Sequence, residues 1–396
     1  MTVWDDLVGQ DRVIAQLRSA AVGARGVLAG EESSGGMTHA WLFTGPPGSG
    51  RATAARAFAA ALQCVSPDLS LGGEPGCGHC DGCHTSLTGT HADVDVVSTE
   101  LLSIGVKETR DLVRRAALSP AGGRWQVIVL EDADRLTEGA GNVLLKAIEE
   151  PAPRTVWMLC APSVEDALPT IRSRCRHVAL RTPPVAAVAD MLMRRDGIDP
   201  EMASYAARAT GGNIDRARRL ATDEQARSRR AEVLGLPLQL GDIGSCMAAA
   251  QRLVDAAAAD AKEITAELDA RETEELRNAL GANGPGGRLP SGTAGVVKEL
   301  ENRQKKRATR TQRDCLDLAL VDLTAFYRDV LTVQLGAPVP LDNEQVRPSV
   351  DRVARAGTPE DTLRRIEAIL ACREAIDANV APLLAVEAMA LTLRAG

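Results

Sequence analysis

Continuous apolar runs alternate with amphipathic stretches in the first half of the chain. The apolar runs of strand length are HAWLFT, WQVIVL, TVWMLCA and HVAL, at residues 39–44, 125–130, 155–161 and 177–180. Helical patterns precede or separate them, at residues 10–22, 52–64 and 142–150. Strands that alternate with helices predict a parallel sheet, because parallel neighbours need a crossover connection that is usually a helix. We therefore expect an α/β domain with helices on both faces of the sheet.

Beyond Pro183 and Pro184 the pattern is helical. Three short amphipathic segments, VAAVADMLMRR, PEMASYAARA and NIDRARRLA, predict a small helical domain. The remainder is helical too, with a glycine-rich interruption at 281–295 whose composition is typical of a flexible segment. The predicted domains are the α/β domain at 1–182, a three-helix domain at 183–224 and a helical domain at 225–396, with a flexible insert near 281–313.

Length and charge narrow the class of protein. At 396 residues the chain exceeds the usual size of one hydrophobic core, so two or three domains are expected. The net charge of −7 argues against autonomous nucleic-acid binding, and the basic run at 303–313 is interpreted as a solvated helix face, with phosphate contact as the alternative. With no secretion pattern and no apolar run long enough to span a membrane, we expect a cytoplasmic protein whose cysteines are reduced or metal-bound.

The stretch GPPGSGRAT, residues 45–53, resembles a phosphate-binding loop that lacks two functional side chains. Such a loop has the pattern G-x-x-x-x-G-K-[ST], in which glycine backbone N–H groups surround phosphates, lysine reaches the β- and γ-phosphates and the hydroxyl holds Mg²⁺. Gly45 and Gly50 have the required spacing, with Gly48 between them, but Arg51 and Ala52 stand at the lysine and hydroxyl positions. A strand before the loop and a helix after it supply the context that such a loop requires.

Four cysteines lie within twenty residues of one another, and the last three form a C-x₂-C-x₂-C pattern. They are Cys64, Cys77, Cys80 and Cys83. Two-residue gaps let thiolates turn toward one centre, and four soft ligands suit tetrahedral Zn²⁺, so we predict a structural zinc site. An iron–sulfur cluster is the chemical alternative, but Cys83 is followed by His84 and lacks the further cysteine and proline of the ferredoxin run. His79 and His84 are alternative ligands, which four cysteines make unnecessary.

Five segments occur in an order that resembles a known family: WDDLVGQ, HAWLFTGPPGSG, the cysteine insert, NVLLKAIEEP and LPTIRSRC. Together they are similar to the AAA+ clamp-loader subunits of bacterial DNA polymerase III, over about residues 1–222. The resemblance implies an AAA+ parallel-sheet domain, a three-helix lid and an all-α C-terminal collar. It also implies a hetero-oligomer with other clamp-loader subunits (gamma or tau ATPase subunits and delta), which acts on the sliding clamp and primed DNA.

Within that family some subunits hydrolyse ATP and one, delta-prime, does not. The sequence departs from the hydrolysing pattern at four places. Those departures are Arg51, Ala52, the inverted acidic pair Glu131–Asp132 and, where active members carry a phosphate-sensing arginine, Asp215. Phosphoryl transfer depends on positioning and charge, so the resemblance favours a subunit that does not turn over ATP with Mg²⁺. The alternatives are an active AAA+ ATPase of the gamma/tau or helicase-loader type, and a metal-stabilised nucleic-acid-binding protein.

Arg174 lies in LPTIRSRC, which resembles the clamp-loader motif that donates an arginine finger to a neighbouring ATP site. A permanently charged guanidinium suits that task, because negative charge spreads over the γ-phosphate during transfer. The resemblance therefore implies that Arg174 acts in trans, with Arg172 and Arg176 as nearby alternatives.

Overall fold

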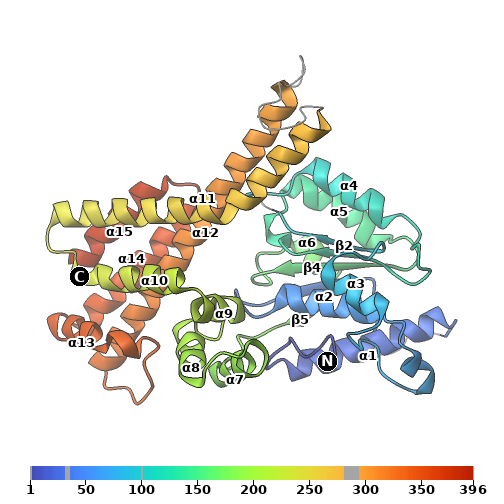
Figure 1. Ribbon diagram of the computed structural model, residues 1–396, viewed down its shortest axis with the longest axis horizontal. Helices are drawn as coiled ribbons and strands as arrows, with labels where there is room; N and C mark the ends of the chain where they lie inside the picture. Colours follow the sequence, from blue (N-terminus) through green and yellow to red (C-terminus); the bar gives the residue numbers. More distant parts are fainter. Residues whose placement is uncertain (1, 32–35, 100, 281–293, 396) are drawn as a thin grey trace. The chain divides into compact units, whose positions relative to one another are not determined.

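The computed structural model describes residues 2–31, 36–99, 101–280 and 294–395 (Figure 1). They form two compact units, Met1–Ala221 and Thr222–Gly396, which are described separately below. Among the described residues, no helix combines the length and the apolar character that crossing a bilayer demands.

The first unit is built on a five-stranded sheet in the order β2-β3-β4-β1-β5. All its neighbouring strands are parallel, and β1 is registered so that Ala40 lies opposite Trp157 of β4. The strands are β1 (Ala40–Thr44), β2 (Val94–Val97), β3 (Gln126–Leu130), β4 (Thr155–Ala161) and β5 (Arg176–Ala179). The predicted parallel α/β architecture is confirmed. Strand β2 was not predicted, because VDVV is short and interrupted by an aspartate.

Helices cover both faces of the sheet, as Figure 1 shows. The helices of this part are α1 (Asp11–Leu28), α2 (Arg51–Leu62), α3 (Asp81–Thr88), α4 (Val106–Ala116), α5 (Glu138–Glu149) and α6 (Pro169–Arg172). Side chains of β3 alternate between two buried clusters: Val127 and Val129 pack with α1 and α2, whereas Ile128 and Leu130 pack with α4 and α5. This alternation follows from the two-residue period of a strand, and it explains why the three inner strands, β1, β3 and β4, are buried and mainly apolar along their whole length.

Three further helices complete the first unit: α7 (Val185–Asp196), α8 (Pro200–Ala209) and α9 (Ile214–Thr222). They have a small core of their own, which includes Val188, Leu192, Ala207 and Leu220. Asp199 caps α8 by accepting hydrogen bonds from two backbone N–H groups, and Pro200 follows at the first helical position, where it needs no hydrogen-bond partner.

The second unit is entirely helical in its described part. Its helices are α10 (Glu224–Gly235), α11 (Ile243–Ala279), α12 (Ala294–Gln334), α13 (Arg347–Ala356), α14 (Pro359–Asp377) and α15 (Pro382–Ala395). Figure 1 shows that α11 and α12 run side by side and extend as a two-helix arm. Along the arm, Arg307 of α12 is buried and pairs with Asp269 and Glu272 of α11.

This arm corrects one prediction. The flexible insert predicted near 281–313 does not extend over residues 294–313, which belong to helix α12. The interpretation of residues 303–313 as a helix face agrees with this helix, but the face is not fully solvated, because Arg307 is buried. The basic residues of the run explain the difference, because Arg303 and Arg307 pair with acidic partners on α11 and hold the two helices together. Residues 281–293 lie outside the described part of the chain.

Candidate metal centre and degenerate phosphate loop

The glycine loop joins β1 to α2 and keeps the backbone shape of a phosphate cradle. Gly48 and Gly50 have φ angles of 80° and 86°, a region that residues with a side chain adopt only under strain. Gly50 caps α2, so the positive end of the helix dipole lies at the loop, as anion binding requires. The Arg51 side chain folds back onto the loop, where its Nη1 donates a hydrogen bond to the Gly45 carbonyl oxygen. Half-buried Ala52 follows and offers no hydroxyl.

The acidic pair at the end of β3 is engaged by other parts of the first unit. Glu131 accepts a hydrogen bond from Nε of Arg56, on α2, at 2.6 Å. Its side chain is only 14% exposed, which makes this ion pair stronger than a solvated surface pair. Asp132 accepts a hydrogen bond at 2.8 Å from the backbone N–H of Thr99, next to the edge strand β2. The place where a Mg²⁺ ion would need free carboxylates therefore holds an internal arginine instead.

A third carboxylate lies close to this pair. Burial raises the pKa of Asp134 above its ordinary value, and the nearby charge of Asp132 acts in the same direction while Arg51 opposes it. The three carboxylates at this end of β3 therefore face the guanidinium groups of Arg51, Arg56 and Arg135, which offset their charge.

The segment between α8 and α9 approaches the loop through a residue that the sequence pattern did not single out. A Cβ atom built on Gly48 would lie 2.2 Å from Cγ of Asn213, so the Asn213 side chain packs directly against the loop. Asn213 also accepts a hydrogen bond at 3.1 Å from the backbone N–H of Arg216, at the start of α9. Asp215, predicted at the phosphate-sensing position, is exposed. The signal was present in GGNID, because asparagine is a preferred residue at a helix N-terminus.

Arg174 lies just after α6, and the exposed fraction of its side chain is 39%. Its Nε donates to Oε1 of Glu149, the last residue of α5, at 2.6 Å, and its Nη2 lies 2.5 Å from the same oxygen. Its Nη1 donates to the Thr170 carbonyl oxygen at 2.9 Å and to Oγ of Ser173 at 3.0 Å. The guanidinium is therefore both solvent-accessible and fixed by four contacts.

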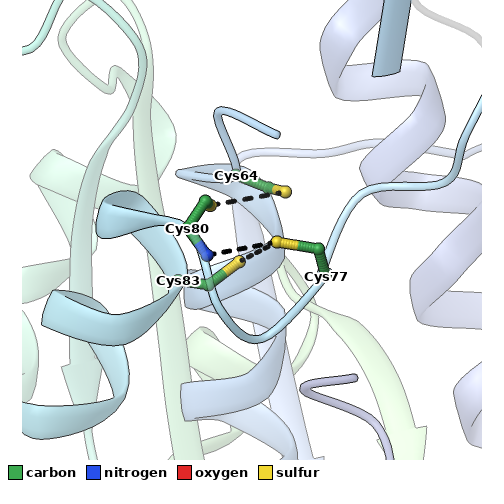
Figure 2. A group of neighbouring side chains, drawn as sticks. All are labelled: Cys64, Cys77, Cys80 and Cys83. Atoms are coloured by element: carbon green, nitrogen blue, oxygen red, sulfur yellow. Dashed lines mark hydrogen bonds between the residues drawn. The ribbon is translucent and has the colours of Figure 1, made fainter. Parts of the chain in front are cut away.

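The four cysteine side chains converge on one point, as Figure 2 shows. Their sulfur atoms lie within 4.8 Å of one another; Cys77 and Cys83 are 4.0 Å apart, and Cys64 and Cys80 are 3.8 Å apart. Zinc–sulfur bonds of about 2.3 Å in a tetrahedron place sulfur atoms about 3.8 Å apart, so the cluster fits one ion. It leaves no space for a cage of several irons, and four thiolates would fill the coordination shell of a single Zn²⁺.

Local structure brings these cysteines together. Cys64 follows the end of α2, and Cys83 lies in the first turn of α3. Gly82 lets the two helices meet, because a Cβ atom there would lie 2.0 Å from the Gln63 carbonyl oxygen. Backbone N–H groups of Val65 and Cys80 donate to the sulfurs of Cys80 and Cys77, each at 3.3 Å, and such bonds stabilise thiolate ligands.

The thiols also share protons unequally. A hydrogen bond from Cys83 lowers the pKa of Cys64 to about 4. The same hydrogen bond, together with burial, raises the pKa of Cys83, and burial raises that of Cys80. A cation that binds the cluster would displace the remaining protons, which is the usual exchange at thiolate metal sites.

The N-terminal segment connects both sites to the sheet. Val3 donates its backbone N–H to the Gly76 carbonyl oxygen at 3.0 Å, and buried Trp4 donates its indole N–H to that of Pro75 at 3.3 Å. Six residues further on, Nε2 of Gln10 donates to the Ser49 carbonyl oxygen in the glycine loop at 3.2 Å and to that of Arg181 at 2.6 Å. WDDLVGQ is therefore a clip that holds the cysteine loop and the phosphate loop in place.

Comparisons with known proteins concern mainly this first unit. The family described as DNA polymerase III, delta subunit, matches residues 24–184. The chain is 35% identical over 199 residues to the delta' subunit of DNA polymerase III from Pseudomonas aeruginosa, covering 50% of this chain and 59% of that protein. It is 32% identical over 214 residues to the gamma/tau subunit from Mycobacterium tuberculosis, covering 52% of this chain and 34% of that protein. The chain thus spans less than two thirds of the length of these relatives.

Among solved structures, a gamma subunit-related protein of DNA polymerase III from Thermotoga maritima aligns over 96% of this chain and 99% of its own, at 14% identity and a TM-score of 0.42. The sheet topology confirms the predicted fold class: a five-stranded parallel α/β domain precedes a region that is all-helical in its described residues.

Proposed function

We propose that the protein is a clamp-loader subunit of the non-hydrolysing, delta-prime type, because residues 24–184 match the family described as DNA polymerase III, delta subunit, and the chain is 35% identical to a delta' subunit over 199 residues. Its complex would load the sliding clamp onto primed DNA, with gamma or tau ATPase subunits and delta as partners in a cytoplasmic hetero-oligomer. The observation that carries the proposal is the phosphate loop, in which Arg51 bonds back to Gly45 while Glu131 is paired with Arg56.

These contacts oppose hydrolysis for a physical reason. Phosphoryl transfer needs a compact ammonium and a metal ion at fixed positions, since the protein contributes mainly positioning and charge. Arg51 is planar and bulky where that ammonium should be, and it is already hydrogen-bonded. Glu131 could bind a metal ion only after losing its partially buried arginine partner.

Arg174 gives the protein a role in ATP hydrolysis at another subunit. We assign it as an arginine finger that completes the ATP site of the neighbouring ATPase subunit. It is accessible to a neighbour, whereas Arg176 stacks over the Trp41 ring at 5.2 Å and donates to the Gly36 carbonyl oxygen. A guanidinium keeps its charge at any working pH and matches the geometry of phosphate oxygens.

The cysteine cluster is assigned to one structural Zn²⁺ ion held by Cys64, Cys77, Cys80 and Cys83. A site with four protein ligands has no open position for water or substrate, so the ion would stabilise the loop between α2 and α3 and would not catalyse a reaction.

A gamma/tau-type ATPase is the second candidate, because relatives with that name match over a similar part of the chain. Such a subunit would release phosphate steadily by itself. The acidic composition, with a net charge of −7, makes a third class, autonomous nucleic-acid binding, less favourable.

The decisive experiment is reconstitution of the clamp loader with Arg174→Ala, with the other ATP sites inactivated. Turnover at the remaining site should fall by about 10³-fold or more, because fingers supplied in trans contribute that much. Arg172→Ala is the matched control, since Arg172 is an exposed arginine in the same segment and should leave turnover unchanged. Normal turnover with Arg174→Ala at that interface would refute the finger assignment.

A further inference from the structure

We infer that Glu149 is the positioning residue for Arg174: it holds the guanidinium in the orientation that a neighbouring ATP site requires. The inference rests on the proposed function, in which Arg174 is the arginine finger. The NVLLKAIEEP segment contains two adjacent glutamates, and Arg174 contacts the first of them, Glu149, and not Glu150.

The contacts of Arg174 divide its guanidinium into two edges. The side edge, formed by Nε and Nη2, faces one carboxylate oxygen of Glu149 at 2.6 and 2.5 Å. The end edge carries Nη1, which donates to the neutral oxygens of Thr170 and Ser173. Of the five N–H donors of an arginine, these contacts use four, counted over the described residues.

The two edges differ in how easily they give up their partners. The bonds to Glu149 are charge-assisted, and such bonds are roughly twice as strong as bonds between neutral groups. An incoming γ-phosphate would therefore displace the neutral partners of Nη1 first. The end edge then faces the phosphate, with Nη1 released and the second Nη2 hydrogen already available, while Glu149 keeps the side edge fixed.

Both partners come from the ends of secondary-structure elements, which makes the arrangement rigid. Glu149 is the last residue of α5, whose buried face includes Leu144 and Ile148. Thr170 lies in α6, whose residue Ile171 is buried in the same cluster. The long arginine side chain would otherwise occupy many rotamers, and fixing it before assembly removes an ordering cost from the binding and transfer steps.

Glu149 could instead be a latch that sequesters the arginine until a neighbour releases it. The two roles predict opposite signs. A positioning residue slows turnover when it is removed, because a small misplacement of a catalytic group can cost up to about 100-fold in rate. A latch speeds turnover, or lowers the KM for ATP, when it is removed.

The test uses the reconstituted clamp loader with one active ATP site, the one that Arg174 completes. Glu149→Ala should lower kcat about tenfold and leave the KM for ATP nearly unchanged, because the finger acts on charge that develops in the transition state. Glu149→Gln keeps an oxygen acceptor in the same place and should recover much of the rate. Glu150→Ala is the matched control, since Glu150 is the exposed neighbour and makes no side-chain hydrogen bond or ion pair within the described residues.

A double-mutant cycle separates this inference from the proposed function. In an Arg174→Ala background, Glu149→Ala should have no further effect, because the group that it positions is gone. Faster turnover with Glu149→Ala, or a rate equal to that of Glu150→Ala while Arg174→Ala is slow, would overturn the positioning role and leave the finger intact. Normal turnover with Arg174→Ala would instead remove the finger, and the positioning role with it. Thermal unfolding of each variant subunit should match the wild type, which confirms that the rate changes do not come from misfolding.

Discussion

Helix α2 has a glycine loop at its N-terminal end and a cysteine cluster at its C-terminal end, and only the cysteine end keeps a complete set of functional side chains. At its N-terminus Gly50 still caps the helix, yet Arg51 and Ala52 replace the side chains that a working loop needs. At its C-terminus Cys64 belongs to a complete set of four thiols. A phosphate cradle is made of backbone, so its shape survives the loss of side chains. A metal site is made of side chains, and it has no shape without them.

The largest effect should come from removing one ligand at the cysteine end. Cys80→Ser should abolish zinc binding and lower the free energy of unfolding of the first unit by about 4 kcal/mol or more, the range associated with loss of a structural metal. Elemental analysis and chemical denaturation would measure the two effects. Cys315→Ser, outside the cluster, is the control and should keep full zinc content. Stoichiometric zinc in Cys80→Ser would contradict the assigned ligand set, and iron in the wild type would contradict the metal.

A smaller effect tests whether the glycine loop at the N-terminal end of α2 packs against Asn213. Gly48→Ala and Gly50→Ala impose similar backbone strain, because both glycines have φ near 80–86°, and each should cost about 1–2 kcal/mol. Only Gly48→Ala also collides with Asn213, so it should cost about 1–3 kcal/mol more.

Asn213→Ala in the Gly48→Ala background should recover part of that additional loss, since it removes Cγ and Nδ2, the two atoms that the new methyl group meets most closely, and leaves only Cβ at 2.7 Å. Thermal unfolding of the three variants measures these differences. Equal midpoints for the two single glycine variants would show that Asn213 does not press on the loop in solution.

The smallest expected effect is none. Arg51→Lys combined with Ala52→Thr restores the side chains of a phosphate loop, but Glu131 stays paired with Arg56 and the acidic pair stays inverted. Phosphate release by the isolated chain should therefore remain at background. Sustained, ATP-dependent phosphate release by this variant would mean that the loop side chains alone had been limiting, and that the two ends of α2 are more alike than their contacts indicate.

The sequence was sufficient for features that depend on local spacing. The C-x₂-C-x₂-C run predicted thiols around one centre because a two-residue gap turns the chain back on itself, and the structure brings all four together. Apolar runs located four of the five strands. Three of them, β1, β3 and β4, are buried on both faces and so have few polar positions, whereas β5 lies at a sheet edge and was recognised only from its short HVAL run. Strand β2 lies at the sheet edge, where Asp95 is tolerated, so its pattern was weaker.

Pairings between distant residues could not be predicted in this way. Arg56 and Glu131 are separated by 75 positions, and many other acidic residues were equally available to that arginine in the sequence. The same holds for the pair of Arg174 and Glu149. Glu149 and Glu150 are adjacent in the sequence, and only the fold shows that the end of α5 directs Glu149 toward Arg174. For residues 303–313 the sequence showed the positive charge, but only the fold showed that acidic side chains of α11 pair with it.

The clip formed by WDDLVGQ also limits the order in which the chain can become fixed. Gln10 is made early during synthesis, but its side-chain partner Arg181 lies 171 positions later. Domains generally fold as units while the chain emerges. The contact between Gln10 and Arg181 therefore forms only when nearly the whole first unit has been synthesised. The contacts of Val3 and Trp4 with the cysteine loop, and of Gln10 with Ser49, need only the first 76 residues. The WDDLVGQ segment is thus secured in two stages, first to the cysteine loop and the glycine loop and last to the chain that follows β5.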